Sequence, residues 1–245
     1  MNLSLGKAGT TSRTCRLSNA SRARLEILAR ENLKGLVRVL NWNEAQNIRF
    51  YRVSSGIIPL ASHPGARWPW RRILAQELLE IGRLVRGKRL RVSMHPGQYT
   101  VLNSPRRSVV GAARAELLYH TDFLDHLRLD ATHKIVVHVG GLYGNRNASL
   151  RRFRKQFRAL PASVKARLVL ENDERNYGTE EVLALSDALG VPMVFDCFHH
   201  IAHAKELPSE KLLARVYEAW SRNDGHLSFI IQHRELAQEL ARMPI

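Results

Sequence analysis

Apolar residues recur at helical spacing early in the chain and form short unbroken runs further along it. Between Leu25 and Leu40, apolar side chains return every three or four residues, which predicts an amphipathic helix with one buried stripe. Later runs such as residues 135–137 are β-branched and do not alternate with polar residues, as is typical of a parallel sheet covered on both faces. The pattern therefore predicts strands that alternate with helices.

The predicted elements follow one another along most of the chain. After the first helix we expect strands at 50–53, 89–94, 134–139, 167–170, 192–196 and 227–231. We expect further helices at 70–87, 108–129, 149–160, 179–189, 209–220 and 235–242. Residues 1–18 are rich in Ser, Thr, Gly and Arg without an apolar period, and we expect an irregular segment there. This alternation predicts one α/β domain over residues 1–245, either a barrel or a doubly wound sheet.

Metal-binding residue types stand at or just beyond the ends of the predicted strands. The carboxyl ends of parallel strands meet at one edge of a sheet or barrel, so these side chains are expected to lie together. A lone histidine is more often a satisfied structural residue, and the acidic run at 171–174 could cap a helix, but such a succession is hard to obtain by accident. The residues in question are His63, His95, His138, Glu171, Asp196 and His199, and His226 stands at the start of the last apolar run.

The charge of the chain indicates what such a cluster would act on. Lys and Arg number 38 against 22 Asp and Glu, a formal net charge of +16, which favours a polyanionic partner unless it only reflects proteome bias or solubility. Imidazoles and carboxylates together suit Zn, Mn or Fe ions, and two-metal sites hydrolyse phosphodiesters. The combination predicts a nuclease.

The segment from His95 to Tyr99 changes abruptly from strand to polar loop. Pro96 and Gly97 predict a turn with Pro at its second position and Gly at its third, which would expose Gln98 and Tyr99. An exposed amide and aromatic pair next to a metal site can stack on, or replace, bases extruded from a duplex. Alternatively, Tyr99 packs against the following helix.

Two cysteines, Cys15 and Cys197, are too few for a disulfide framework. The first residues lack the apolar core of a secretory signal, and no run is long enough to span a membrane. We therefore expect a soluble protein of a reducing compartment, the cytoplasm, without membrane contact.

Five segments together resemble the UV damage endonuclease family: residues 60–64, 93–99, 138–144, 170–174 and 195–200. The resemblance implies a TIM-type (β/α)8 barrel related to endonuclease IV, with about three divalent ions, usually Mn2+. It also implies nicking of double-stranded DNA 5′ of pyrimidine dimers, 6-4 photoproducts and some abasic sites. Carried over by position, it makes metal ligands of the seven residues named above, with Glu171, His199 and His95 at the centre of catalysis. Gln98 and Tyr99 match the pair that enters the duplex opposite the lesion, and Asn2 matches an asparagine near the lesion.

The chain departs from the family pattern at both ends. Family members begin with a strand carrying Gly-Tyr-Pro, whereas this chain begins at Met1-Asn2, and Asp224 stands where the family has a lysine. After His226 the expected Ser-Ser-Gln is replaced, and the later ligands are absent unless His233 substitutes for one. We therefore expect an incomplete barrel without its first and last strands, in a chain shortened by an internal start and by a frame change or stop near Phe229.

These observations lead to a metal-dependent, monomeric DNA repair endonuclease as the main hypothesis. One alternative is a truncated, catalytically impaired relative that still binds DNA. The other is a metal-dependent sugar isomerase or epimerase on the same barrel, which the net charge of +16 and the Gln98–Tyr99 pair disfavour.

Overall fold

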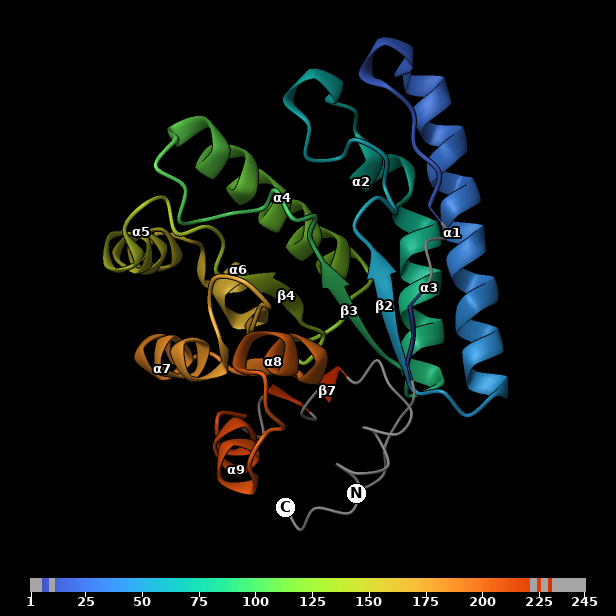
Figure 1. The fold of residues 1–245 in the computed structure, drawn as a ribbon. Helices are drawn as coiled ribbons and strands as arrows, with labels where there is room; N and C mark the ends of the chain where they lie inside the picture. Colours follow the sequence, from blue (N-terminus) through green and yellow to red (C-terminus); the bar gives the residue numbers. More distant parts are fainter. Residues whose placement is uncertain (1–5, 9–11, 221–223, 226–228, 231–245) are drawn as a thin grey trace. The chain divides into compact units, whose positions relative to one another are not determined.

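Strands and helices alternate along the described chain, with each strand before the last followed by a helical segment (Figure 1). The computed structural model describes residues 6–8, 12–220, 224–225 and 229–230. The strands are β1 (Gly6–Ala8), β2 (Phe50–Ser54), β3 (Arg91–His95), β4 (Ile135–His138), β5 (Leu168–Glu171), β6 (Met193–Asp196) and β7 (Phe229–Ile230). The α-helices are α1 (Arg22–Ala45), α2 (Trp70–Ile73), α3 (Ala75–Gly87), α4 (Arg107–His126), α5 (Arg146–Arg158), α6 (Ala162–Arg167), α7 (Thr179–Leu189), α8 (Cys197–Ala204) and α9 (Glu210–Glu218). Two 3-10 turns are η1 (Leu17–Asn19) and η2 (Pro64–Ala66).

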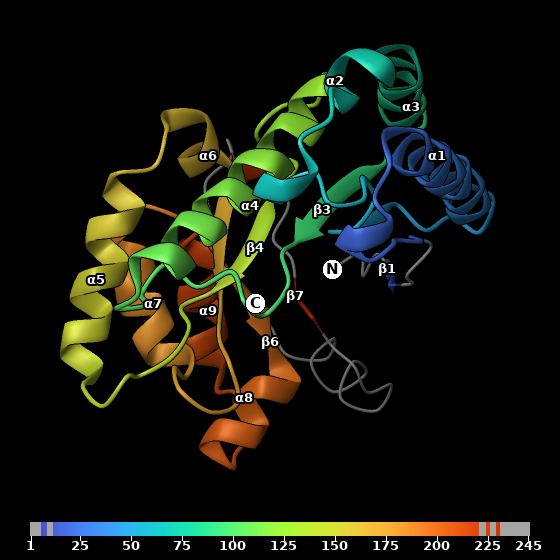
Figure 2. The same ribbon diagram turned by 90° about the horizontal axis from the view of Figure 1, so that it is seen from above.

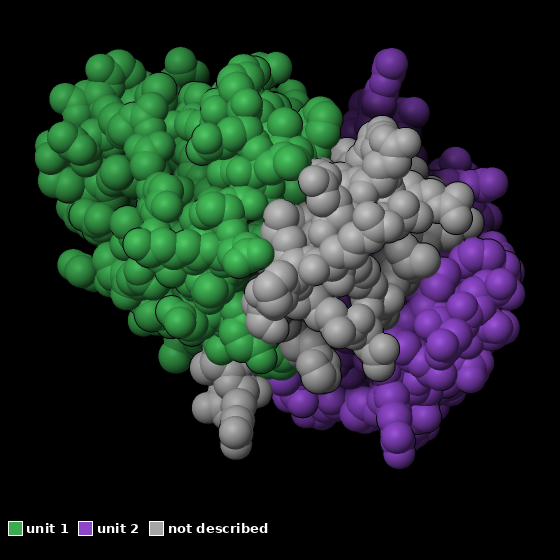
Figure 3. All heavy atoms as spheres, turned by 60° about the horizontal axis from the view of Figure 1, so that its bottom comes forward, with its two compact units in different colours: residues 1–3, 98–114, 136–245 green, residues 4–97, 115–135 purple. Residues whose placement is uncertain are grey.

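The chain divides into two compact units, which Figure 3 colours separately. Unit 1 comprises residues 98–114 and the described residues from 136 onwards. Unit 2 comprises the described residues up to 97, together with residues 115–135. In each unit the strands pair in parallel and in the order of the sequence.

Unit 2 is built on β2, which pairs with β1 on one side and with β3 on the other. Tyr51 and Val53 of β2 are buried, whereas the alternate residues Phe50, Arg52 and Ser54 are only partly buried. Helix α1 is capped by Ser21, whose hydroxyl accepts a hydrogen bond from the Arg24 backbone N at 3.2 Å. Helices α1 and α3 lie side by side, and α1 packs against β2 (Figure 1). The apolar stripe of α1 is thus buried, as its spacing predicts.

Unit 1 is built on β5 and β6, in which every residue is buried. Val136, Val169 and Val194 pack together from three successive strands, and Trp220 covers them. The Trp220 indole donates a hydrogen bond to the Met193 carbonyl at 2.6 Å, which attaches the end of the α9 segment to β6. Helix α8 leaves directly from the end of β6 (Figure 2). This continuous buried core fixes the positions at which β5 and β6 end.

Several predicted elements differ from those observed. The prediction of an irregular segment over residues 1–18 is wrong at Gly6–Ala8, which pairs with β2. The helix predicted at 70–87 is interrupted at Leu74, where the backbone leaves helical geometry. Helices α6 and α8 were not predicted, since six or eight residues are too short for a clear apolar period. The helix predicted at 235–242 lies outside the described residues, and a single domain over 1–245 stays a prediction.

No helix in the described part of the chain combines the length and apolar character that crossing a membrane requires.

Candidate metal centre

Three predicted ligands meet in unit 1, where β5 and β6 end. Glu171 is the last residue of β5, Asp196 is the last residue of β6, and His199 lies in the first turn of α8. One ligand atom from each residue lies within 4.8 Å of those from the other two. Because β5 and β6 are neighbouring parallel strands, their last residues Glu171 and Asp196 lie close together. Helix α8 begins directly after Asp196, so that His199 in its first turn lies beside the two carboxylates.

Hydrogen bonds hold His199 in a defined orientation. The Asp196 carboxylate accepts a hydrogen bond from the His199 backbone N at 3.0 Å and thereby caps α8. The His199 ring Nδ1 lies 2.9 Å from the Asn172 carbonyl oxygen, which can only accept, so Nδ1 carries the proton. The other ring nitrogen, Nε2, is left with the lone pair that a metal ion needs.

Asn172 is a supporting residue that sequence reasoning missed. Its side-chain amide donates to the Asp196 carbonyl at 2.9 Å, and its side-chain oxygen accepts from the Asp196 backbone N at 2.9 Å. Asn172 thus ties the ends of β5 and β6 together while its own carbonyl orients His199. The only signal in the sequence is its place beside Glu171, which does not reveal these contacts.

The cluster concentrates negative charge away from water. Glu171 and Asp196 are 2% and 1% exposed. Burial raises the pKa of the Asp196 carboxyl; the contacts with His199 oppose this rise, whereas the charge of Glu171 adds to it. A divalent cation would relieve this repulsion, and mixed carboxylate and imidazole ligands suit Mn, Fe or Zn. The donor set and its electrostatics therefore fit a metal ion.

His138 adjoins the same cluster from β4. Its Nε2 lies 3.8 Å from the nearer carboxylate oxygen of Glu171, and its ring centroid lies 5.7 Å from that of His199. Unit 1 therefore brings together four of the predicted ligands.

The predicted ligands His63 and His95 belong to unit 2. His63 is exposed, and its Nδ1 accepts a hydrogen bond from the Gly65 backbone N at 3.0 Å, which begins the η2 turn. His95 is the half-buried last residue of β3, with Nδ1 at 2.9 Å from the Pro96 carbonyl. The position of His95 at a strand end agrees with the sequence pattern, while the metal-binding role of both residues stays a prediction.

The loop after β3 exposes the residues expected to probe DNA. Tyr99 is 82% exposed, so its ring does not serve packing against the following helix. The turn itself is centred on Gln98 and Tyr99. The predicted turn with Gly97 at its third position is wrong in detail, since Gly97 does not have the positive φ that this geometry requires.

Three further site predictions lie outside the described residues: Asn2, His226 and His233.

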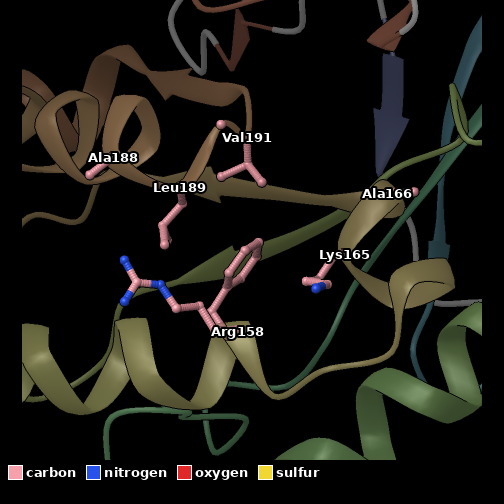
Figure 4. A pocket seen from close by; sticks show the side chains of 8 residues that line it. Arg158, Lys165, Ala166, Ala188, Leu189 and Val191 are labelled. Carbon is pink, nitrogen blue, oxygen red and sulfur yellow. The ribbon is translucent and has the colours of Figure 1, made fainter.

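A separate hollow of about 410 Å3 in unit 1 lies away from these groups (Figure 4). Its lining includes Lys165, just before β5, and Val191, just before β6. It therefore lies at the N-terminal ends of the strands, whereas Glu171 and Asp196 lie at the C-terminal ends. In barrels of this type the N-terminal ends serve stability rather than chemistry.

Comparison with known proteins identifies relatives of this chain. The family model described as UV-endonuclease UvdE matches residues 1–237. The UV DNA damage endonuclease of Clostridium perfringens is 37% identical over 219 residues, which are 89% of this chain and 53% of that protein. The UV DNA damage endonuclease of Bacillus pumilus is 39% identical over 191 residues, 78% of this chain and 60% of that protein. The chain thus spans between half and two thirds of the length of these relatives.

Solved structures support the predicted fold class, and the sequence relatives support the family. The crystal structure of SacUVDE is 37% identical, has a TM-score of 0.84 and aligns with 88% of this chain and 76% of that one. Endonuclease IV from Thermus thermophilus is similar in fold. It is 18% identical, with a TM-score of 0.53, over 76% of this chain and 67% of that one. These similarities confirm the predicted α/β fold of the TIM-barrel type, with an incomplete barrel. The chain belongs to the UV-endonuclease UvdE family.

Proposed function

We propose that this chain is a metal-dependent DNA repair endonuclease that nicks DNA on the 5′ side of UV photoproducts. Its substrates would be pyrimidine dimers and 6-4 photoproducts, with abasic sites as a further class. The observation that carries the proposal is the cluster of two buried carboxylates, Glu171 and Asp196, with the half-buried His199 at the strand ends of a chain from this family. Relatives at 36–39% identity are named UV DNA damage endonucleases.

The proposed ligands are the cluster itself, His138 beside it, and His63, His95 and His226. The proposed ions are Mn2+, about three in all, and they would stabilise charge on the phosphate during hydrolysis. Glu171, His199 and His95 are the proposed catalytic residues. Within unit 1, the chain's own contribution is to hold two buried carboxylates and one imidazole of fixed tautomer at a common point.

The proposed partner is double-stranded DNA that contains the lesion, bound by a monomer. The net charge of +16 supports attraction to the phosphate backbone. The exposed Gln98 and Tyr99 are proposed to enter the duplex opposite the damage, with Asn2 near the lesion pocket. D-psicose 3-epimerase has a similar fold, at 13% identity and a TM-score of 0.51. This similarity concerns the fold alone, so no specific observation favours the isomerase alternative.

Incision of supercoiled plasmid tests the proposal. We expect the purified chain with Mn2+ to nick UV-irradiated plasmid and to leave unirradiated plasmid intact. Glu171→Gln should abolish nicking because it removes a buried carboxylate of the cluster. Glu180→Gln is the matched control, since Glu180 is an exposed carboxylate of the same unit that pairs with Arg215. Binding to irradiated plasmid without nicking would instead favour the impaired DNA-binding relative.

A further inference from the structure

The loop after β4 carries an aromatic ring that the proposed function has not used. Tyr143 is 46% exposed, and its φ of +49° lies in the left-handed region that bulky residues rarely adopt. The loop follows directly on His138, and both belong to unit 1. An exposed aromatic side chain kept in an unfavourable backbone conformation is more typical of binding sites than of packing.

The backbone of this loop is held by side chains from elsewhere in unit 1. The Asn103 amide donates to the Gly141 carbonyl at 2.8 Å, and the Ser149 hydroxyl donates to the Leu142 carbonyl at 2.6 Å. Gly140 has a φ of +108°, and a Cβ there would lie 2.5 Å from the Asn103 side-chain oxygen. The loop is therefore fixed in the conformation that exposes Tyr143.

The Tyr143 ring is held in place as well as its backbone. It lies back over Gly141, where an added Cβ would come within 3.1 Å of the ring. The Arg152 guanidinium lies 5.6 Å from the ring centroid. Two hydrogen bonds of 2.7 Å, to the Asn103 carbonyl and the Ser149 hydroxyl, fix that guanidinium. The ring thus loses its freedom before any ligand arrives, which reduces the entropic cost of binding.

We infer that the Tyr143 ring, held by Arg152 and Gly141, is a stacking platform for a nucleobase turned out of the DNA duplex beside the lesion. This inference rests on the proposed function. A braced aromatic ring in the loop that follows a proposed metal ligand suits an unstacked base, because every base presents a flat face to stack. Stacking of one base on an aromatic side chain contributes about 1–3 kcal/mol, roughly 5- to 150-fold in affinity.

Substitutions at Tyr143 separate the ring from the loop. Asn tolerates a positive φ better than Tyr, so Tyr143→Asn removes the ring without straining the loop. Tyr143→Phe keeps the ring and removes only the hydroxyl. Tyr217→Ala is the control, because Tyr217 is another exposed aromatic residue of unit 1, 57% exposed on α9. Melting temperature and circular dichroism verify that each variant folds.

The experiment measures binding of the full chain to a synthetic duplex with one thymine dimer, and to the same duplex undamaged, in EDTA. We expect Tyr143→Asn to weaken binding of the damaged duplex by about tenfold, and Tyr143→Phe and Tyr217→Ala by less than twofold. Binding of the undamaged duplex should change little in any variant. 2-Aminopurine beside the dimer should show stacking-dependent quenching in wild type and in Tyr143→Phe but not in Tyr143→Asn.

Equal losses on damaged and undamaged DNA, or unchanged quenching in Tyr143→Asn, would overturn the inference. In that case a wild-type chain that still prefers the damaged duplex leaves the proposed function intact. A wild-type chain that binds both duplexes equally would overturn the proposed function and this inference together.

Discussion

At the scale of single residues, Asp196 combines a structural and a proposed chemical task. Its carboxylate caps α8 and also belongs to the cluster with Glu171 and His199. Asn is a good N-cap but lacks the charge, so Asp196→Asn should lose bound metal and, when both proteins are metal-free, keep a melting temperature close to that of wild type. Asp196→Ala should lose both the metal and about 1 kcal/mol of stability. Metal analysis by mass spectrometry and thermal melts distinguish the two losses.

Ser209→Ala provides the control for capping alone. The Ser209 hydroxyl accepts a hydrogen bond from the Leu212 backbone N at 3.2 Å and caps α9 in the same unit. Its loss should reduce stability by about 1 kcal/mol without changing the metal content. If Asp196→Asn retained all its metal, Asp196 would be a cap and not a ligand.

His120 predicts a pH dependence of stability that is independent of the cluster in unit 1. It is fully buried in α4, and burial lowers its pKa from its usual value of 6.5 to about 4. Below pH 6.5 the unfolded chain therefore takes up a proton that the folded chain does not. The free energy of unfolding should fall as the pH decreases from about 6.5 to about 4, by at most about 3 kcal/mol.

Replacing the ring isolates this effect. In His120→Gln, the free energy of unfolding should no longer show this decrease between pH 6.5 and 4. Urea unfolding of the variant and of wild type at each pH measures the difference. His126→Gln is the matched control: His126 lies 2.7 Å from the carbonyl four residues earlier, as His120 does, but is only half-buried. Glu116 has a pKa raised by burial and acts in the opposite direction, so the difference between wild type and variant is the informative quantity. An unchanged slope in His120→Gln would assign the acid sensitivity to other groups.

At the scale of elements, α5 has an unusual charge pattern. It carries six Lys and Arg residues and no Asp or Glu in 13 residues. Arg151, Lys155 and Arg158 are exposed at spacings of four and three, on one face of the helix. Like charges at this spacing destabilise a helix slightly, so the pattern is more easily explained by an anionic partner than by stability.

Neutralising this face should weaken DNA binding through its electrostatic part. We expect a weaker salt dependence when Arg151, Lys155 and Arg158 are changed to Gln. The slope of log affinity against log salt concentration should decrease in magnitude by roughly 2 to 3. Folding stability should stay equal or rise. The same change at Arg22, Lys34 and Arg38 on α1, which also carries Glu26, Glu31 and Glu44, is the control and should alter the slope less. Equal effects of the two triple variants would indicate attraction by net charge alone.

The ends of a helix could be predicted from the sequence where neighbouring residues alone determine them. Helix α7 has the predicted bounds, Thr179–Leu189, because its apolar period is regular and Gly190 ends it in the left-handed region. Helix α8 was not predicted, since its start is set by the Asp196 side chain capping the helix directly after a strand. The strand ends indicated Glu171 and Asp196, but the role of Asn172 depends on contacts between two strands. The sequence therefore indicates which residues are candidate metal ligands more readily than it indicates which residues hold those ligands in position.

At the scale of the whole molecule, the cluster should link metal binding to global stability. Glu171 and Asp196 are both buried, and their mutual repulsion is a cost that the folded state bears. A ligand that binds only the folded chain stabilises it by about 2.7 kcal/mol at a hundred times its dissociation constant. The melting temperature should therefore rise with Mn2+ concentration and return to its original value after chelation.

Glu171→Gln turns this expectation into a two-sided test. Without metal, the variant should melt at or above the wild-type temperature, since one of two repelling buried charges is gone while the volume is kept. With Mn2+ it should gain much less stability than wild type, because a ligand is lost. Differential scanning calorimetry across a Mn2+ series measures both effects, with Glu180→Gln expected to behave as wild type. A metal-free variant much less stable than wild type would mean that Glu171 is held by favourable contacts of the folded chain and that repulsion does not prevail there.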